Sequence, residues 1–206
     1  MSEAPASACD VVVLAAGEER SVVLPVDVAA GEERRIALAF SLPARARLTI
    51  VVVGSCQGLL IVERTVRLLG ADAAAVLTTA IDVTASGRIA VVDDVTVCAP
   101  RGKATVGVRH VVRDAARSEV RSRLTLMPEA HGTQAFARAE QMLLGERPFA
   151  GAIPELDIRV DDVACGHAAW VARPRERDRF YLTARGISES AVDDMLAQAF
   201  LCPIAI

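Results

Sequence analysis

Short apolar runs, many with alternating polar neighbours, recur along the chain between turns rich in glycine and proline. The turns lie roughly 11–16 residues apart, which is the spacing expected of short strands in an all-β protein. Runs such as "RLTIVVVG" at residues 47–54 and "RIAVVDDVTVCA" at residues 88–99 combine β-branched residues with a two-residue period. Because side chains alternate between the faces of a strand, this pattern predicts strands with one face buried.

Two neighbouring segments nearly repeat each other in sequence. "AAGEERSVVLPVDV" at residues 15–28 is followed directly by "AAGEERRIALAFSL" at residues 29–42. Even turn spacing and stacked aliphatic runs are typical of a solenoid, in which each coil repeats the inward-facing positions of its neighbour. A β-sandwich has similar strand spacing but usually carries a Trp or Tyr in its core, and here the single Trp170 and Tyr181 fall near the C-terminus. The pattern favours a β-solenoid over a sandwich without excluding the sandwich.

The C-terminal segment has a helical period instead. Ser188 is a good N-cap residue, and Pro203 is expected to end the helix. One apolar face is formed by Val192, Met195, Leu196, Ala199 and Phe200. The sequence therefore predicts a β core over residues 1–186 and one amphipathic helix with a tail over residues 187–206. The apolar face is expected to dock on the β core, with a partner protein as the alternative.

Composition narrows the function further. Of 206 residues, 52% are hydrophobic and only 3% aromatic, so the core is expected to be aliphatic. The net charge of −3 argues against nucleic acid as a partner, and no apolar run approaches the ~18 residues of a membrane span. The five cysteines are widely spaced, without a C-x-x-C pair, and no signal peptide is recognisable. These features predict a cytoplasmic protein with reduced thiols and no membrane association.

One motif carries candidate chemistry, the Cys165–Gly166–His167 segment within "DDVACGHAAW". A thiolate and an imidazole suit iron–sulfur clusters or zinc, and residues two apart on a strand point to the same side. A stable site needs about four ligands, so the others must come from elsewhere or from a second chain. The alternative is a structural cysteine beside a hydrogen-bonded histidine. For His110 and His131 we expect packing and turn roles, respectively.

A longer resemblance gives this motif a context. "PELDIRVDDVACGHAAWV" at residues 154–171 and "RDRFYLTARGISESAVDDMLAQAF" at residues 177–200 resemble the terminal signature of the SufB/SufD family of iron–sulfur cluster assembly scaffolds. "VRSRLTLMPEAHGTQAFARAEQMLLGE" at residues 120–146 is similar to the same family. The resemblance implies a right-handed parallel β-helix and pairing of two β-helices, as a homodimer or with a SufB-like paralogue. It also implies an ABC ATPase partner of the SufC type.

The resemblance also assigns roles to residues. It makes Cys165 and His167 candidate iron–sulfur or metal ligands at an interchain site, holding a transient cluster. The positions that carry cysteines in the SufB branch are Ala135 and Ala139 here, which makes the chain SufD-like and a sulfur-accepting role doubtful. No counterpart of the family's N-terminal helical region is recognised in the sequence.

The expected function is therefore that of a non-catalytic scaffold component. No nucleophile signature, phosphate-binding loop or acid–base pair predicts an enzyme active site. Tyr181, Arg185 and Gly186 are expected to fix the turn into the closing helix rather than touch a ligand. The main alternative is a structural or adaptor β-solenoid that has lost cluster binding, and a small metalloenzyme using Cys165 and His167 is a weaker third.

Overall fold

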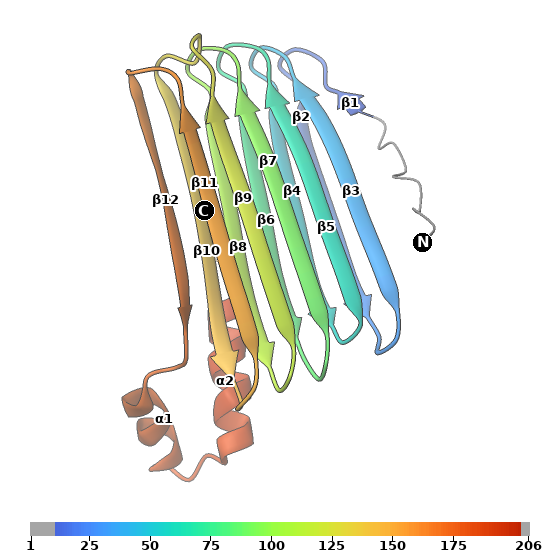
Figure 1. Cartoon of the computed structure of the whole chain (residues 1–206), viewed down its shortest axis with the longest axis vertical. Coiled ribbons are helices and arrows are strands. Elements are labelled where there is room, and N and C mark those ends of the chain that lie inside the picture. Colours follow the sequence, from blue (N-terminus) through green and yellow to red (C-terminus); the bar gives the residue numbers. More distant parts are fainter. Residues whose placement is uncertain (1–10, 203–206) are drawn as a thin grey trace, which may run out of the picture.

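The computed structural model describes residues 11–202, in which parallel strands form a β-solenoid of about six turns (Figure 1). The odd-numbered strands form one sheet, the odd sheet, in the order β1 (Val11–Val13), β3 (Glu33–Leu42), β5 (Leu59–Leu68), β7 (Arg88–Val97), β9 (Arg117–Leu126) and β11 (Phe149–Ile158). The even-numbered strands form the even sheet, in the order β2 (Glu19–Val28), β4 (Arg47–Cys56), β6 (Ala74–Val83), β8 (Lys103–Arg113), β10 (Thr133–Leu144) and β12 (Val163–Ala172). One odd and one even strand make one coil.

Consecutive strands lie in opposite sheets, and each strand pairs in parallel with the strand two positions along the chain. This connectivity confirms the solenoid that the sequence favoured and excludes the sandwich. The core between the sheets is aliphatic, as the composition predicted, because the inward-facing rows consist mainly of Val, Leu, Ile and Ala. Between the sheets the buried residues form two apolar clusters, one toward each end of the strands, and a third cluster lies under α2.

The near-repeat in the sequence corresponds to a repeated turn. In the turn before β2, the Glu18 carboxylate accepts a hydrogen bond from the Ala15 N–H at 2.7 Å. In the turn before β3, Glu32 accepts from the Ala29 N–H at 3.1 Å. The two "AAGEER" segments therefore form the same kind of turn at the two ends of one coil. One turn leads into the even sheet and the other into the odd sheet.

Two helices follow the last strand, where the sequence predicted only one. The predicted helix is α2 (Glu189–Leu201), and the Ser188 side chain caps it by accepting from the Ala191 N–H at 3.4 Å. The additional helix α1 (Glu176–Thr183) lies within the range assigned to the β core, so that assignment was wrong for this segment. No residue of α1 is buried, and a helix without an apolar face has no sequence pattern to reveal it. The predicted stop at Pro203 lies outside the described residues.

The turn between the helices has the structure expected of its three conspicuous residues. The Arg185 guanidinium lies 4.2 Å from the centre of the Tyr181 ring, a cation–π contact. Gly186 has φ +85°, a left-handed conformation that glycine adopts without steric cost after a helix. The structure thus places Arg185 and Gly186 in the turn, with Tyr181 in contact with it from α1.

Helix α2 packs on the outer face of the even sheet. Leu196 and Phe200 of its predicted apolar face contact the apolar cluster there, whereas Met195 is exposed. Ala197 of α2 is buried against Val111 of β8 and Met142 of β10. Arg113 extends this contact by pairing with Asp82 of β6 at 3.0 Å and with Asp194 of α2 at 2.7 Å. Neither helix within residues 11–202 is long and apolar enough to cross a membrane.

Candidate functional site

Cys165 and His167 lie on β12, the strand that forms one edge of the even sheet (Figure 1). Within the described residues β12 pairs with β10 alone, with Cys165 opposite Ala135 and His167 opposite Ala137. Both alanines are buried in the core, so the cysteine and the histidine continue two inward-facing rows of the sheet. The structure thus places both predicted residues on the same side of one strand.

The end of the solenoid leaves these two side chains accessible. Ala135 is 0% exposed and Ala137 3%, because β10 lies between β8 and β12. Cys165 is only half-buried, packed against the edge of the core, and His167 is exposed. A thiol and an imidazole on an unstacked inward face can reach a ligand without any rearrangement of the core.

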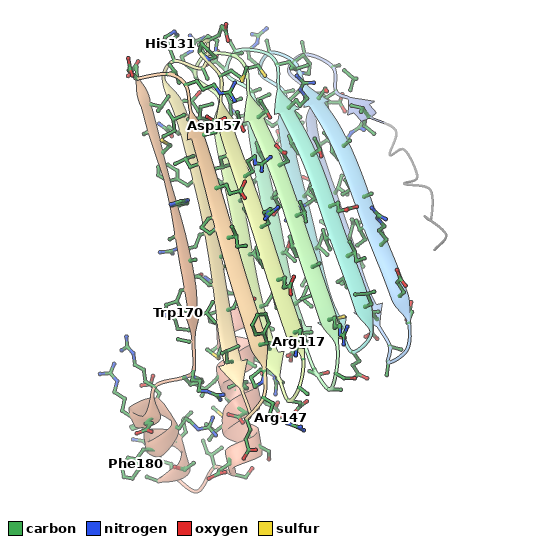
Figure 2. All side chains as sticks on the ribbon, in the orientation of Figure 1. Arg117, His131, Arg147, Asp157, Trp170 and Phe180 are labelled. Atoms are coloured by element: carbon green, nitrogen blue, oxygen red, sulfur yellow. The ribbon has the colours of Figure 1, made fainter. Side chains whose placement is uncertain are left out.

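The outer side of β12 has a different character, because it borders α2. A pocket of about 370 Å³ lies there, lined by Arg138, Ala139, Glu140, Ala168, Trp170 and Phe200. The Trp170 and Phe200 rings lie 5.7 Å apart, and the Arg109 guanidinium is 5.2 Å from the Phe200 ring centre. Arg109 also pairs with Glu140 at 2.6 Å. Figure 2 shows Trp170 on the half of β12 nearer the helices. The outer side of β12 therefore contacts α2 through Trp170, while Cys165 and His167 lie on the opposite side of the strand.

The number of donors at this site is two. No group of three or more His, Cys, Asp or Glu side chains within residues 11–202 is arranged to hold a metal ion. Thiolate sulfur and imidazole nitrogen are donors that iron and zinc accept, but four are needed for a closed site. Cys165 and His167 can therefore contribute half of a ligand set, with the other half supplied from outside the described part of the chain.

The other two histidines have the roles that the sequence predicted. His110 of β8 is fully buried, and its Nδ1 lies 2.8 Å from the Ser118 Oγ. Burial, together with the positive charge of Arg64, lowers the pKa of His110 to about 3, so the ring is neutral. His131 lies exposed in a turn, and its carbonyl accepts from the Arg101 N–H at 2.7 Å (Figure 2).

Sequence reasoning missed a buried ion pair between the two apolar clusters. Arg64 of β5 binds the Asp93 carboxylate of β7 at 2.6 and 2.9 Å, and both side chains are 0% exposed. The same guanidinium donates to the Thr78 carbonyl at 3.0 Å and to the Thr79 hydroxyl at 2.9 Å across the core. The sequence could have revealed this pair, because the two-residue period of their strands places Arg64 and Asp93 at inward-facing positions between buried apolar residues.

The cysteines are consistent with the sequence prediction of free thiols. Within the described part of the chain, no disulfide joins Cys56, Cys98, Cys165 or Cys202 to another cysteine. Cys9 lies outside the described residues. The described thiols form no disulfide framework, and of the four only Cys165 lies on the accessible inward face of β12.

Comparison of the sequence with known proteins identifies a family. The sequence model of the family described as "SUF system FeS cluster assembly, SufBD core domain" matches residues 34–200. That match includes both helices and every strand from β3 onward almost in full.

Individual relatives carry related names. The chain is 31% identical over 107 residues to an iron–sulfur cluster assembly SufBD family protein of Mycobacterium tuberculosis. These residues cover 52% of this chain and 13% of the relative. It is 30% identical over 92 residues to the iron–sulfur cluster assembly protein SufD of Escherichia coli, covering 45% of this chain and 22% of SufD. It is 24% identical over 105 residues to SufB of Bacillus subtilis, covering 51% of this chain and 23% of SufB.

These matches span less than a quarter of each relative's length, so they do not carry the whole activity of those proteins to this chain. The family match, in contrast, covers most of this chain. Together with the β-solenoid and its two terminal helices, it shows that the chain belongs to the SufBD family of iron–sulfur cluster assembly proteins.

Proposed function

We propose that this chain is a SufD-like, non-catalytic scaffold component that helps to hold an iron–sulfur cluster during its assembly in the cytoplasm. The observation that carries the proposal is the pair Cys165 and His167 on the accessible inward face of β12. A SufD-like assignment is supported by Ala135 and Ala139, which occupy the positions where the SufB branch carries cysteines. Both alanines are buried and carry no donor atom.

The cluster is cargo in this proposal, and the protein's residues only bind it. The Cys165 sulfur would bind iron as a thiolate and the His167 ring through one nitrogen, the kind of mixed ligation that iron–sulfur centres use. The inward row places both donors on one side of β12, with Cα atoms roughly 6.6 Å apart along the strand. Iron could therefore be bound by both residues without any change in the strand.

The missing ligands are assigned to a second chain. An edge strand presents unpaired N–H and C=O groups, and another strand can add to it through main-chain hydrogen bonds. Such pairing along β12 would bring a partner's side chains to the same face as Cys165 and His167. The partner is a second copy of this chain or a SufB-like paralogue, and the cluster would be held at the interface.

An ABC ATPase of the SufC type is the second proposed partner. The two helices carry exposed apolar side chains, with Phe180 at 74%, Tyr181 at 55% and Met195 at 46% exposure. Figure 2 shows Phe180 on α1, below the strand bundle. Aromatic residues and methionine are enriched at protein interfaces, which supports a docking role for this helical unit.

The experiment that tests the cluster proposal is anaerobic reconstitution with ferrous iron and sulfide, with and without a SufB-like partner. Wild type should develop a visible chromophore with iron and sulfide bound, and both Cys165→Ala and His167→Ala should lose most of it. Cys202→Ala and His131→Ala are matched controls, because they remove an exposed thiol and an exposed imidazole elsewhere on the chain. Both controls should reconstitute like wild type.

The alternative is an adaptor β-solenoid that keeps the fold and the partners but binds no cluster. The small donor count and the alanines at 135 and 139 favour it. A wild type that forms a dimer by light scattering but binds no iron, alone or with a partner, would support the adaptor. A chromophore that survives both ligand substitutions would likewise exclude Cys165 and His167 as its ligands.

A further inference from the structure

Polar side chains inside the solenoid connect the two sheets at several levels. On β8 of the even sheet, His110 is bound to Ser118 on β9 of the odd sheet through Nδ1 and Oγ, 2.8 Å apart. One strand further along, Gln141 on β10 donates from Nε2 to the Gly151 carbonyl of β11 at 2.9 Å. His110 and Gln141 are register partners on adjacent strands, so their side chains lie side by side in one inward row.

Each of these side chains has one polar atom without a partner. His110 Nε2 and Gln141 Oε1 are buried, and neither has a hydrogen-bond partner within residues 11–202. Both residues are 0% exposed, so bulk water cannot reach them. Buried polar groups in folded proteins are nearly always hydrogen-bonded, and two orphans at adjacent positions of one row point to a shared partner.

The hydrogen-bonding capacity of the two atoms defines that partner. The Gly151 carbonyl is an acceptor, so the amide nitrogen of Gln141 must face it and Oε1, an acceptor, must face away. His110 Nε2 either carries a proton or accepts one, depending on how Nδ1 and Ser118 share theirs. A water molecule can donate to Oε1 and can either accept from Nε2–H or donate to bare Nε2, so it suits both tautomers.

We propose that one water molecule is bound inside the solenoid between His110 Nε2 and Gln141 Oε1. It links β8 to β10 and completes the hydrogen bonding of both side chains. Gln141 is the register partner of Val171 on β12, so the site is one strand away from the open edge. The water site lies in the interior of the core, apart from the proposed cluster ligands on β12.

The surroundings of the site favour a neutral ligand. A cation would meet the positive charge of Arg64, which already disfavours protonation of His110. An anion would find no free cationic donor in Arg64, because that guanidinium is bound to Asp93 and to the oxygens of Thr78 and Thr79. A neutral ring and a neutral amide match water in both charge and hydrogen-bond capacity.

The direct test is a crystal structure of the whole chain at a resolution that shows ordered water. The expected result is density for one water within hydrogen-bond distance of both atoms. In solution, the Gln141 side-chain amide or the His110 ring N–H should show a nuclear Overhauser contact to a long-lived water, and the chain has only three histidines to assign. A direct contact between Nε2 and Oε1 with no density between them would overturn the proposal, and so would an empty space.

A double-mutant cycle tests the same link energetically. His110→Phe and Gln141→Leu should each reduce the folding equilibrium constant, because each leaves the water and the other side chain short of a partner. If the two effects were independent, the double variant would lower the folding equilibrium constant by the product of the two single factors. We expect its folding equilibrium constant to be roughly tenfold higher than that product predicts. The control cycle pairs Gln141→Leu with Thr79→Val on β6, two strands away, and its effects should multiply. Purely multiplicative behaviour of the His110 and Gln141 variants would contradict the bridge.

Discussion

Two histidines on the inward face of the same sheet have opposite surroundings. His110 on β8 is enclosed by strands on both sides, hydrogen-bonded to Ser118 and held neutral by burial. His167 on β12 occupies the same face two strands further along, but no strand of the described chain follows it, and it is exposed. The difference lies in stacking and not in residue type. An inward position is structural where coils cover it on both sides and becomes available for binding where the stack ends.

The thiols show the same contrast. Cys56 on β4 is fully buried, and burial raises the pKa of its thiol. Its sulfur lies 3.4 Å from the Gly58 carbonyl. Cys165 lies on the inward face of the same sheet but at the open edge, where it is half-buried. Four predictions test whether enclosure explains these differences.

The largest expected effect is a pH dependence that belongs to the enclosed histidine. The pKa of His110 is lowered from its ordinary value of 6.5 to about 3, so the unfolded state binds the extra proton first as pH falls. The stabilising contribution is complete above pH 6.5 and is lost between there and pH 3, by roughly 4–5 kcal/mol in the free energy of unfolding. Urea unfolding of wild type and His110→Phe between pH 6.5 and pH 3 measures this loss. The free energy of unfolding should fall more steeply with decreasing pH in wild type than in the variant.

The control for this effect is His167→Ala, which removes the histidine at the open edge. This variant keeps the enclosed His110 ring, so the slope that His110 contributes should remain. If His110→Phe kept the wild-type slope instead, the enclosed ring would not be the titrating group, and the comparison between the two histidines would fail.

The buried ion pair gives the next largest effect. Asp93→Ala leaves the Arg64 guanidinium charged and unpaired inside the core, and removing one partner of a buried pair typically costs about 3–5 kcal/mol. Chemical denaturation at neutral pH measures the loss. Glu63→Ala is the matched control, because it breaks an exposed pair with Arg35 and should leave the stability of the chain nearly unchanged. Equal effects at the two sites would contradict the role of enclosure.

A smaller difference in stability is expected between alanine substitutions of two valines on the even sheet. Val112→Ala on β8 removes two methyl groups from a 0% exposed position and should cost about 2 kcal/mol. Val171→Ala on β12, at 40% exposure, should cost less than about 0.5 kcal/mol in the isolated chain. If β12 is the pairing edge, Val171→Ala should also weaken association in sedimentation or light scattering. A costly Val171→Ala in a monomer would show that the last coil is as tightly packed as the others.

The last prediction leaves stability unchanged and concerns reaction rate alone. Under native conditions iodoacetamide should alkylate Cys165 much faster than Cys56, because the Cys56 sulfur is enclosed and its pKa is raised. Peptide mapping by mass spectrometry resolves the individual cysteines, and Cys202 serves as an exposed reference. In strong denaturant the two rates should converge. Persistent native labelling of Cys56 would mean that the central coils open readily.

Much of this architecture was predictable from local patterns. The two-residue period and even turn spacing predicted the strands, and Ser188 followed by an apolar face predicted α2. The prediction that Cys165 and His167 share one side of a strand is confirmed by their register with Ala135 and Ala137. These features depend on neighbours in sequence, which is why the sequence reveals them.

What the sequence did not predict depends on contacts between distant segments. Helix α1 has no buried face and therefore no apolar period. The match of Arg64 with Asp93 depends on which positions fall opposite each other one coil apart, and that register is fixed by the lengths of several turns. Sequence reasoning also could not distinguish enclosed from open coils, so it gave Cys165 and His167 a shared side but not their exposure.

The stacking of coils also makes the length of the molecule adjustable. Neighbouring strands in a sheet lie about 4.8 Å apart, so adding or removing one whole coil would shift β12 by that step relative to the first strands. The inward rows would stay aligned, because each coil repeats the same positions. The number of coils thus sets the distance between the β12 edge and the first strands of the solenoid. The chemistry of the β12 edge does not depend on that number.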